Sequence, residues 1–338
     1  MLKSGEKFKW SALSLCILGV FAAGVFAQPQ PPKTPIYGVK RKLPPSKKLP
    51  GVVGDSEKSL VVDANVAIKL CVLEGKLKIT GWERNEVRVF VKDGGSLGFK
   101  ILEKDAATGK PVWILVTGER SEQPTGETKE CLSGGNIEID VPLRSSLSLS
   151  GRVAETTVDS VKKVGVKNIG GDITLRNISG GIMAATYEGD VTVENSGGSI
   201  SLESSTGNIV AFEVSPGQIG DLFKAKTNNG LISLQKVDHR QIEANSISGS
   251  VLFNGKFLSG GLYNFKTSNG SIKLTIPHDS SCTITAAYGF GSFNSDIPLN
   301  IVTENVSPGG KNVVATIASG NATVNLTTNS GHIGIRKQ

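Results

Sequence analysis

Residues 169–213 consist of five consecutive nine-residue units, and this repeat constrains the fold more than any other feature of the chain. Each unit carries glycine at its third place and apolar residues at its fifth and seventh places. Apolar residues two apart follow the period of a β-strand with one buried face, and the glycine permits a bend with positive φ. The glycines are Gly171, Gly180, Gly189, Gly198 and Gly207; the apolar rows are Ile173, Ile182, Val191, Ile200, Ile209 and Leu175, Ala184, Val193, Leu202, Ala211.

A short strand followed by a tight bend, repeated without longer connections, predicts an all-β solenoid. In this single-stranded, β-helix-like fold each coil buries the apolar rows of its neighbours. One coil could contain two units, which gives a flattened solenoid, or three, which gives a triangular one, and the repeat does not decide between them. The composition agrees with this fold class, because 41 glycines and only two methionines among 338 residues favour strands and turns over helices.

The first 27 residues are typical of a secretory signal peptide. Lys3, Lys7 and Lys9 precede an apolar run that ends at Ala27, so we expect cleavage before Gln28 and an exported product in the periplasm, on the cell surface or outside the cell. A retained membrane anchor is the alternative, although the run is shorter than a usual membrane span. Lipidation at Cys16 is not expected, because no small residue precedes it.

Residues 28–55 form a predicted disordered linker that is rich in proline and basic residues. The stretch to residue 50 contains seven of the 14 prolines and six basic residues without an acid, so it should stay extended. Together with the signal peptide it accounts for the formal net charge of +7, and we expect no nucleic-acid partner for the folded part. Contact of the linker with anionic envelope polymers is the functional alternative to a plain spacer.

Two distant segments match each other, residues 135–146 and 270–281. Glycine, three alternating apolar residues, proline and a serine pair coincide in both. The match predicts two related modules, residues 56–150 and 151–338, of which the second is lengthened by the nonapeptide block. The chain ends on Ile335, Arg336 and Lys337, charges that would discourage pairing if this strand lay at an open edge.

Three cysteines remain after cleavage of the signal peptide, which leaves at least one of them unpaired. Export permits disulfides, and Cys71 with Cys131 is the expected pair because both lie in the first half. Cys282 occupies an inward strand position and should be a small buried group. The absence of a C-x-x-C spacing argues against a zinc site.

These features resemble a bacterial family of exported β-strand-repeat proteins that carry the label putative adhesins. The likeness rests on the recurring Gly-(Asp/Ser/Asn)-(Ile/Val)-x-(Leu/Val) signature, on the strand that ends in Pro277, and on the late segments 295–299 and 329–333. It covers most of the chain from about Ser56 onward. The resemblance implies a domain of unknown function with a presumed adhesive role, and it brings no catalytic residues.

No catalytic, cofactor-binding or metal-binding residue is predicted. Asp172, Asp190 and Asn208 are spaced by 18 residues and would stack at one corner of a two-unit coil; we interpret them as turn residues, with a weak calcium site as the alternative. The segment 278–280 contains the letters of a hydrolase triad, but adjacent residues cannot form that geometry. The three histidines, which are His239, His278 and His332, are expected at the surface or in turns.

The outward strand positions are predicted to be polar. They carry Thr174, Thr192 and Ser201 beside charged residues, namely Arg176, Glu194 and Glu203. Trp82 and Trp113 are interpreted as packing residues rather than as a sugar platform. The sequence therefore predicts a non-catalytic, adhesin-like interaction module with an unknown surface, glycan or envelope ligand. The alternatives are an envelope scaffold that self-associates through open coil ends and a carbohydrate-active enzyme.

Overall fold

The computed structural model describes residues 54–122, 128–217 and 220–338. The predicted signal peptide and nearly all of the predicted linker lie outside these ranges. Residues Pro50–Gln338 form one compact unit. The described ranges contain strands and no helix, so they offer no helix that could cross a membrane.

The strands, in chain order, are β1 (Ser56–Val61), β2 (Ala67–Trp82), β3 (Glu86–Lys92), β4 (Gly98–Lys104), β5 (Pro111–Thr117), β6 (Glu119–Glu122), β7 (Thr128–Cys131), β8 (Asn136–Pro142), β9 (Ser146–Asp159), β10 (Lys163–Gly170), β11 (Ile173–Arg176), β12 (Ile182–Glu188), β13 (Val191–Gly197), β14 (Ile200–Thr206), β15 (Ile209–Ser215), β16 (Leu222–Asn229), β17 (Ile232–Val237), β18 (Gln241–Ser248), β19 (Val251–Asn254), β20 (Leu262–Asn269), β21 (Ile272–Ile276), β22 (Cys282–Phe290), β23 (Phe293–Ser295), β24 (Asn300–Ser307), β25 (Gly310–Ile317), β26 (Ala322–Ser330) and β27 (Ile333–Lys337).

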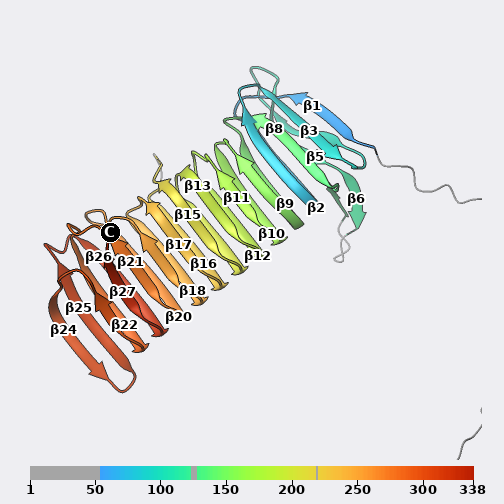
Figure 1. The fold of residues 1–338 in the computed structure, drawn as a ribbon. Coiled ribbons are helices and arrows are strands. Elements are labelled where there is room, and N and C mark those ends of the chain that lie inside the picture. Colours follow the sequence, from blue (N-terminus) through green and yellow to red (C-terminus); the bar gives the residue numbers. More distant parts are fainter. Residues whose placement is uncertain (1–53, 123–127, 218–219) are drawn as a thin grey trace, which may run out of the picture. The chain divides into compact units, whose positions relative to one another are not determined.

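One coil contains two nonapeptide units, one strand on each of two faces. In the block, β11 pairs in parallel with β13, with Ile173 opposite Val191, and β12 pairs in parallel with β14. Alternate strands therefore stack on the same face, and the result is the flattened form of the predicted solenoid (Figure 1).

Each face is a continuous ladder of strands. One face, here called face A, runs in the order β4, β5, β2, β9, β10, β12, β14, β16, β18, β20, β26, β22, β25, β24. The opposite face, face B, runs β1, β3, β8, β2, β9, β11, β13, β15, β17, β19, β21, β27, β23. The long strands β2 and β9 belong to both faces, since their first halves pair on face A and their second halves on face B.

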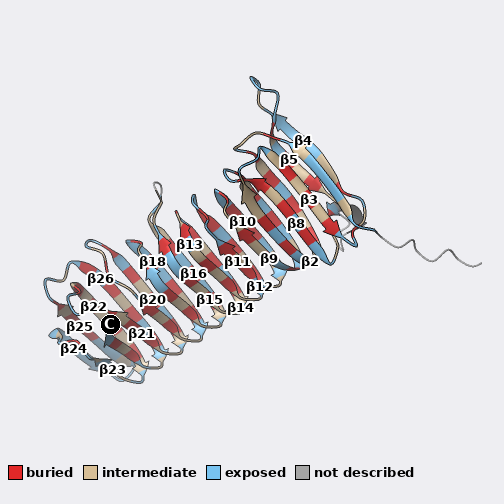
Figure 2. Cartoon of the chain, turned by 45° about the horizontal axis from the view of Figure 1, so that its top comes forward, coloured by how far each residue is buried: buried red, intermediate tan, exposed pale blue. Residues whose placement is uncertain are grey.

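The core lies between the two faces and consists of the predicted apolar rows. All ten apolar residues of the nonapeptide block are buried, and Ile173, Val191 and Ile200 have no exposed surface. Figure 2 shows the resulting alternation of buried and exposed residues along the strands. Burial of each such aliphatic side chain stabilises the fold by about 1.5–3 kcal/mol, so the stacked rows supply most of the driving force.

A column of glycines forms one edge of the solenoid. Gly189 has a φ of 140°, and a Cβ atom on it would overlap the carbonyl group of Gly171 in the preceding coil. The same relation continues from coil to coil through Gly207, Gly230, Gly249, Gly270, Gly331 and Gly291. The glycines of alternate repeat units, Gly171, Gly189 and Gly207, are therefore required by the close approach of backbones as well as by the bend.

Buried hydroxyl groups line the inside of the same edge. Thr227 and Thr267, for example, donate hydrogen bonds to the carbonyl oxygens of Gly207 and Gly249, at 2.9 and 2.7 Å. Equivalent bonds to the glycine carbonyl of the preceding coil in the stack are made by Thr186, Ser204, Ser246 and Thr328. The hydroxyls satisfy glycine carbonyls that face the core, which would otherwise carry a desolvation cost.

Each of the two matching segments, residues 135–146 and 270–281, connects two coils that are not neighbours in the stack. Another coil lies between them. After β8 the chain continues as β9, but β2 lies between these two strands. After β21 it continues as β22 and β23, but β26 and β27 lie between. In both segments the proline ends the strand and its carbonyl accepts the N–H of the first serine of the pair, from Ser145 and from Ser280. The match therefore marks a step across one inserted coil at each end of the stack.

This arrangement corrects the expectation for the chain end. The strand β27, which carries Arg336 and Lys337, is no open edge, because it pairs with β21 on one side and β23 on the other. The expected boundary at residues 150 and 151 falls inside β9, whose two halves belong to one coil. The division into two related modules, residues 56–150 and 151–338, stays a prediction from the sequence.

The strands β6 and β7 form a separate two-stranded sheet, and residues 123–127 lie outside the described ranges. The disulfide between Cys71 and Cys131 confirms the expected pair and fastens β7 to β2. Cys282 is a free, buried cysteine, as expected.

Candidate functional site

The outer faces of the solenoid carry exposed ion pairs between neighbouring coils. Arg176 pairs with Glu194 at 2.8 Å on face B, and Lys226 pairs with Glu203 at 3.3 Å on face A. All four side chains are more than a third exposed, so each pair contributes only about 0–1 kcal/mol. The predicted outward positions of Thr174, Thr192 and Ser201 are confirmed by their intermediate exposure. At these positions both faces are therefore polar, and neighbouring coils neutralise each other's charges.

The expected stack of acidic and amide residues at one corner is confirmed. The Oδ1 atom of Asp172 accepts the N–H of Asp190 at 2.8 Å, and Oδ1 of Asp190 accepts the N–H of Asn208 at 2.7 Å. These side chains cap the bends of neighbouring coils, which is the turn role expected for them. Within the described ranges no three His, Cys, Asp or Glu residues come together as metal ligands.

The buried histidine contradicts the sequence expectation. His239 has no exposed surface; its Nε2 atom lies 2.8 Å from the carbonyl oxygen of Gly198, and its ring lies 5.8 Å from that of Phe223. Burial lowers the pKa of His239, and the neutral ring can then donate from Nε2. His278 and His332 are exposed, as expected. Burial raises the pKa of Cys282 to about 11, so this thiol stays protonated and unreactive.

The two described tryptophans differ in their surroundings. The indole N–H of Trp82 donates to the carbonyl oxygen of Glu86 at 2.8 Å, and the guanidinium of Arg84 lies 5.1 Å from its ring centre. This agrees with the expected packing at a strand end. Trp113 instead lies on the outer side of β5 and is 44% exposed, so its interpretation as a packing residue was wrong.

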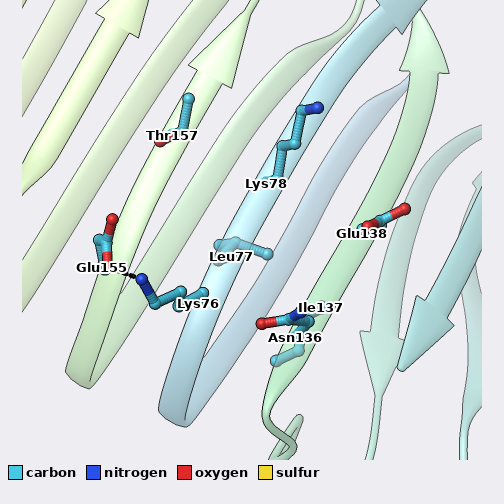
Figure 3. Close-up of a pocket in the computed structure, with 8 residues that line it drawn as sticks. All are labelled: Lys76, Leu77, Lys78, Asn136, Ile137, Glu138, Glu155 and Thr157. Carbon is cyan, nitrogen blue, oxygen red and sulfur yellow. Dashed lines mark ion pairs between the residues drawn. The ribbon is translucent and has the colours of Figure 1, made fainter. Parts of the chain in front are cut away.

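Two hollows lie on the outer side of face B, one near each end of the stack. The first, of about 240 Å³, is formed by β8, β2 and β9 (Figure 3). Lys76 points toward Glu155 across it, with an ion-pair distance of 2.9 Å, and Lys78 stands beside them. Two long lysine side chains thus line this first hollow.

The second hollow, of about 220 Å³, is formed by β21, β27 and β23. Its centre is Gly334, and a Cβ atom on this residue would meet no other atom within 4 Å. Around it stand Lys273, Arg336, Asp296, Asn294 and His332. Among the ion pairs between described residues, none involves Lys273, Arg336 or Asp296.

A short hydrogen-bond chain closes one side of this second hollow. The amide of Asn294 donates to Oγ of Ser292 at 3.1 Å, and that oxygen lies 2.9 Å from Nδ1 of His332. Because Oγ accepts from Asn294, it can donate its own proton to Nδ1. No hydrogen bond between described residues reaches Nε2 of His332, which leaves that atom for a ligand. This group could not be recognised in the sequence, because Ser292 and Asn294 are about 40 residues from His332 in the chain.

A solved structure described as that of a putative cell adhesion protein from Clostridium sporogenes ATCC 15579 is similar at 12% identity, with a TM-score of 0.27; the likeness covers 84% of this chain and 100% of that one. A search of curated proteins found no match. The sequence profile of the Toastrack DUF4097 family matches residues 114–336, which is more than half of the chain. This chain, an all-β solenoid, therefore belongs to the Toastrack DUF4097 family.

Proposed function

We propose that this protein is a non-catalytic, adhesin-like interaction module of the bacterial cell surface or envelope, and that it binds its ligand at the second hollow on face B. The observation that carries the proposal is the set of unpaired charges around Gly334. Some exposed charges elsewhere on the faces, such as Arg176 and Glu194, are paired between coils, whereas Lys273, Arg336 and Asp296 converge on one hollow and make no ion pair with another described residue. Unpaired charges of both signs around a hollow offer binding contacts to a ligand.

The scaffold supports a binding role because it holds these groups on rigid strands. Lys273 lies on β21 and Arg336 on β27, which pair in parallel over five residues. The aliphatic residues behind them, Ile333 and Ile335, are buried. A site on packed strands loses little conformational freedom when a ligand binds.

Export is supported by the disulfide between Cys71 and Cys131. Disulfides persist in the periplasm and outside the cell and are rare in the reducing cytosol. The predicted signal peptide agrees with this compartment, although its residues lie outside the described ranges.

Binding of the full exported chain to immobilised envelope polymers and host-type surfaces tests the proposal. The panel would contain peptidoglycan, lipopolysaccharide, capsular polysaccharides and matrix proteins, and binding would be followed by biolayer interferometry. We expect saturable binding to at least one of them, without any change in the polymer's length. Absence of binding across the panel, or release of cleaved products, would contradict a non-catalytic binding role.

A second candidate function, self-assembly into an envelope scaffold, is favoured by the edge strand β24. All eight of its residues are exposed, among them Ile301, Val302 and Val306, which are 56%, 58% and 67% exposed. Its free edge carries one charged residue, Glu304, whereas the edge strand β4 at the other end carries Lys100, Glu103 and Lys104. An apolar edge strand without protecting charges is a template for pairing with another chain.

Light scattering across a range of protein concentrations tests the scaffold. If β24 pairs between copies, the molar mass rises with concentration, and the Val306→Lys variant stays monomeric. The matched control is Thr192→Lys, on face B in the middle of the stack, which should associate like the wild type. A monomer at all concentrations would exclude this candidate and leave the binding role intact.

A further inference from the structure

The two hollows on face B occupy equivalent places in the fold. In the first, the inserted strand β2 lies between β8 and β9, with Lys78 opposite Glu138 on one side and Thr157 on the other. In the second, the inserted strand β27 lies between β21 and β23, with Gly334 opposite Lys273 and Asn294. Lys78 and Gly334 thus hold the same position in the two inserted coils.

The two positions differ in whether a side chain fills the centre. At the first hollow, Lys78 occupies this position and lines the hollow, and the neighbouring Lys76 is paired with Glu155. At the second, glycine places no side chain at this position, and the pair beside it is the hydrogen bond between His332 and Ser292. The two hollows therefore share one architecture and are similar in volume, about 240 and 220 Å³, but only the second has a glycine at the central position of its inserted strand.

No backbone requirement accounts for glycine at position 334. Its φ is not in the positive region, and there is open space where a side chain would stand. Glycine weakens the interior of a strand, and in that position it often marks close approach of a ligand. The surrounding groups define the chemistry of such a ligand. Lys273 and Arg336 suit a carboxylate, while Asp296, Asn294 and Nε2 of His332 suit hydroxyl groups.

We propose that the second hollow binds one carboxylated sugar unit of an acidic polysaccharide, with the face of the sugar ring on Gly334. The hollow is smaller than the roughly 300–1,000 Å³ of sites for drug-sized ligands, so it accommodates one unit. This inference rests on the proposed binding role and names the ligand class of that site.

Titration of the full chain with oligogalacturonate tests the proposal, because this probe is a chain of carboxylated sugars. The same oligomer with its carboxylates methyl-esterified is the first control probe, and polyglutamate, which carries carboxylates on a peptide chain, is the second. We expect binding of oligogalacturonate that weakens as salt is added, and much weaker binding of both controls. Equal binding of the ester or of polyglutamate would overturn the assignment to an acidic sugar.

Variants locate the binding site. Gly334→Val fills the hollow with a side chain that strands favour, and it should abolish binding at concentrations where the wild type is half-saturated. Lys273→Gln and Arg336→Gln should each weaken binding roughly tenfold, the effect of losing one charge-assisted hydrogen bond. Ser233→Val is the matched control for added bulk, because Ser233 lies in the same row of face B away from the hollow; it should bind like the wild type.

The outcomes separate this proposal from the proposed function. If the wild type binds an envelope polymer but no oligogalacturonate, the ligand class is wrong and the binding role stands. If oligogalacturonate binds equally to Gly334→Val, Lys273→Gln and Arg336→Gln, the hollow is not its site. If neither oligogalacturonate nor any envelope polymer binds the wild type, both proposals fail.

Discussion

Substitution of one glycine in the edge column should cost far more than substitution of a glycine on the open face. In Gly189→Ala the alanine would have to adopt a φ of 140°. Its Cβ would lie 2.7 Å from the carbonyl carbon of Gly171, and the carbonyl oxygen would be closer still. The strained backbone costs about 1–3 kcal/mol, and forcing the two coils apart costs about 1–3 kcal/mol more. We therefore expect a loss of about 2–6 kcal/mol in the free energy of unfolding.

Gly165→Ala is the matched control. Its Cβ would meet its nearest atom, the carbonyl oxygen of Leu147, at 3.7 Å, and its φ is not in the positive region. Replacing glycine by alanine within a regular strand should stabilise the fold by about 0.5–1 kcal/mol. Urea unfolding followed by circular dichroism measures both variants, provided that the slope of the transition stays constant. Equal midpoints for the two variants would refute the close approach of backbones along the column.

Three further predictions concern buried groups. Reduction of the disulfide between Cys71 and Cys131, which are separated by 60 residues, should lower stability by about 4 kcal/mol on the chain-entropy estimate, as measured by urea unfolding with and without reductant. Thr227→Val should cost about 1–3 kcal/mol, because the carbonyl of Gly207 loses its 2.9 Å hydrogen bond; a variant as stable as the wild type would show that this hydroxyl ladder is dispensable. Burial lowers the pKa of His239, so the unfolded chain binds this proton first, and the stability that His239 confers is present above about pH 6.5 and is lost as the pH falls toward the lower folded pKa. His239→Gln should reduce the loss of stability between pH 7 and pH 5, and an unchanged pH dependence would contradict this assignment.

The architecture of the middle of the stack could be predicted from the sequence, because the information there is local. Glycine and aliphatic residues recur every nine residues, so Ile173, Val191 and Ile200 had to share one buried side. The number of units per coil was not predictable from the repeat, since two-sided and three-sided solenoids bury the same rows. The 18-residue spacing of Asp172 and Asp190 fitted the two-unit form, and their hydrogen bond now confirms it.

The ends of the stack could not be predicted, because strand pairing there is non-local. A terminal strand such as β27 has the same apolar alternation whether it lies at an edge or between two other strands, and only the three-dimensional order places Gly334 between Lys273 and Asn294. Gly334 also looked like one more glycine of a glycine-rich chain. His239 was missed for a related reason, since corner residues usually face solvent and its buried partners, Gly198 and Phe223, come from other coils.

The C-terminal coil, β26 and β27, is inserted between the coil of β20 and β21 and the coil of β22 and β23. This insertion alone assembles the proposed binding site. Asn264 on β20 and Asn325 on β26 lie side by side, with a side-chain hydrogen bond of 2.8 Å, while Thr285 on β22 lies one strand beyond Asn325. Adjacent strands are about 4.8 Å apart, within the range that a disulfide spans, whereas strands two places apart are not. The account predicts that the Asn264→Cys, Asn325→Cys double variant forms a disulfide under mild oxidation and that the Asn264→Cys, Thr285→Cys variant does not. The reverse result would place β22 next to β20, remove Gly334 from its neighbours and contradict the account.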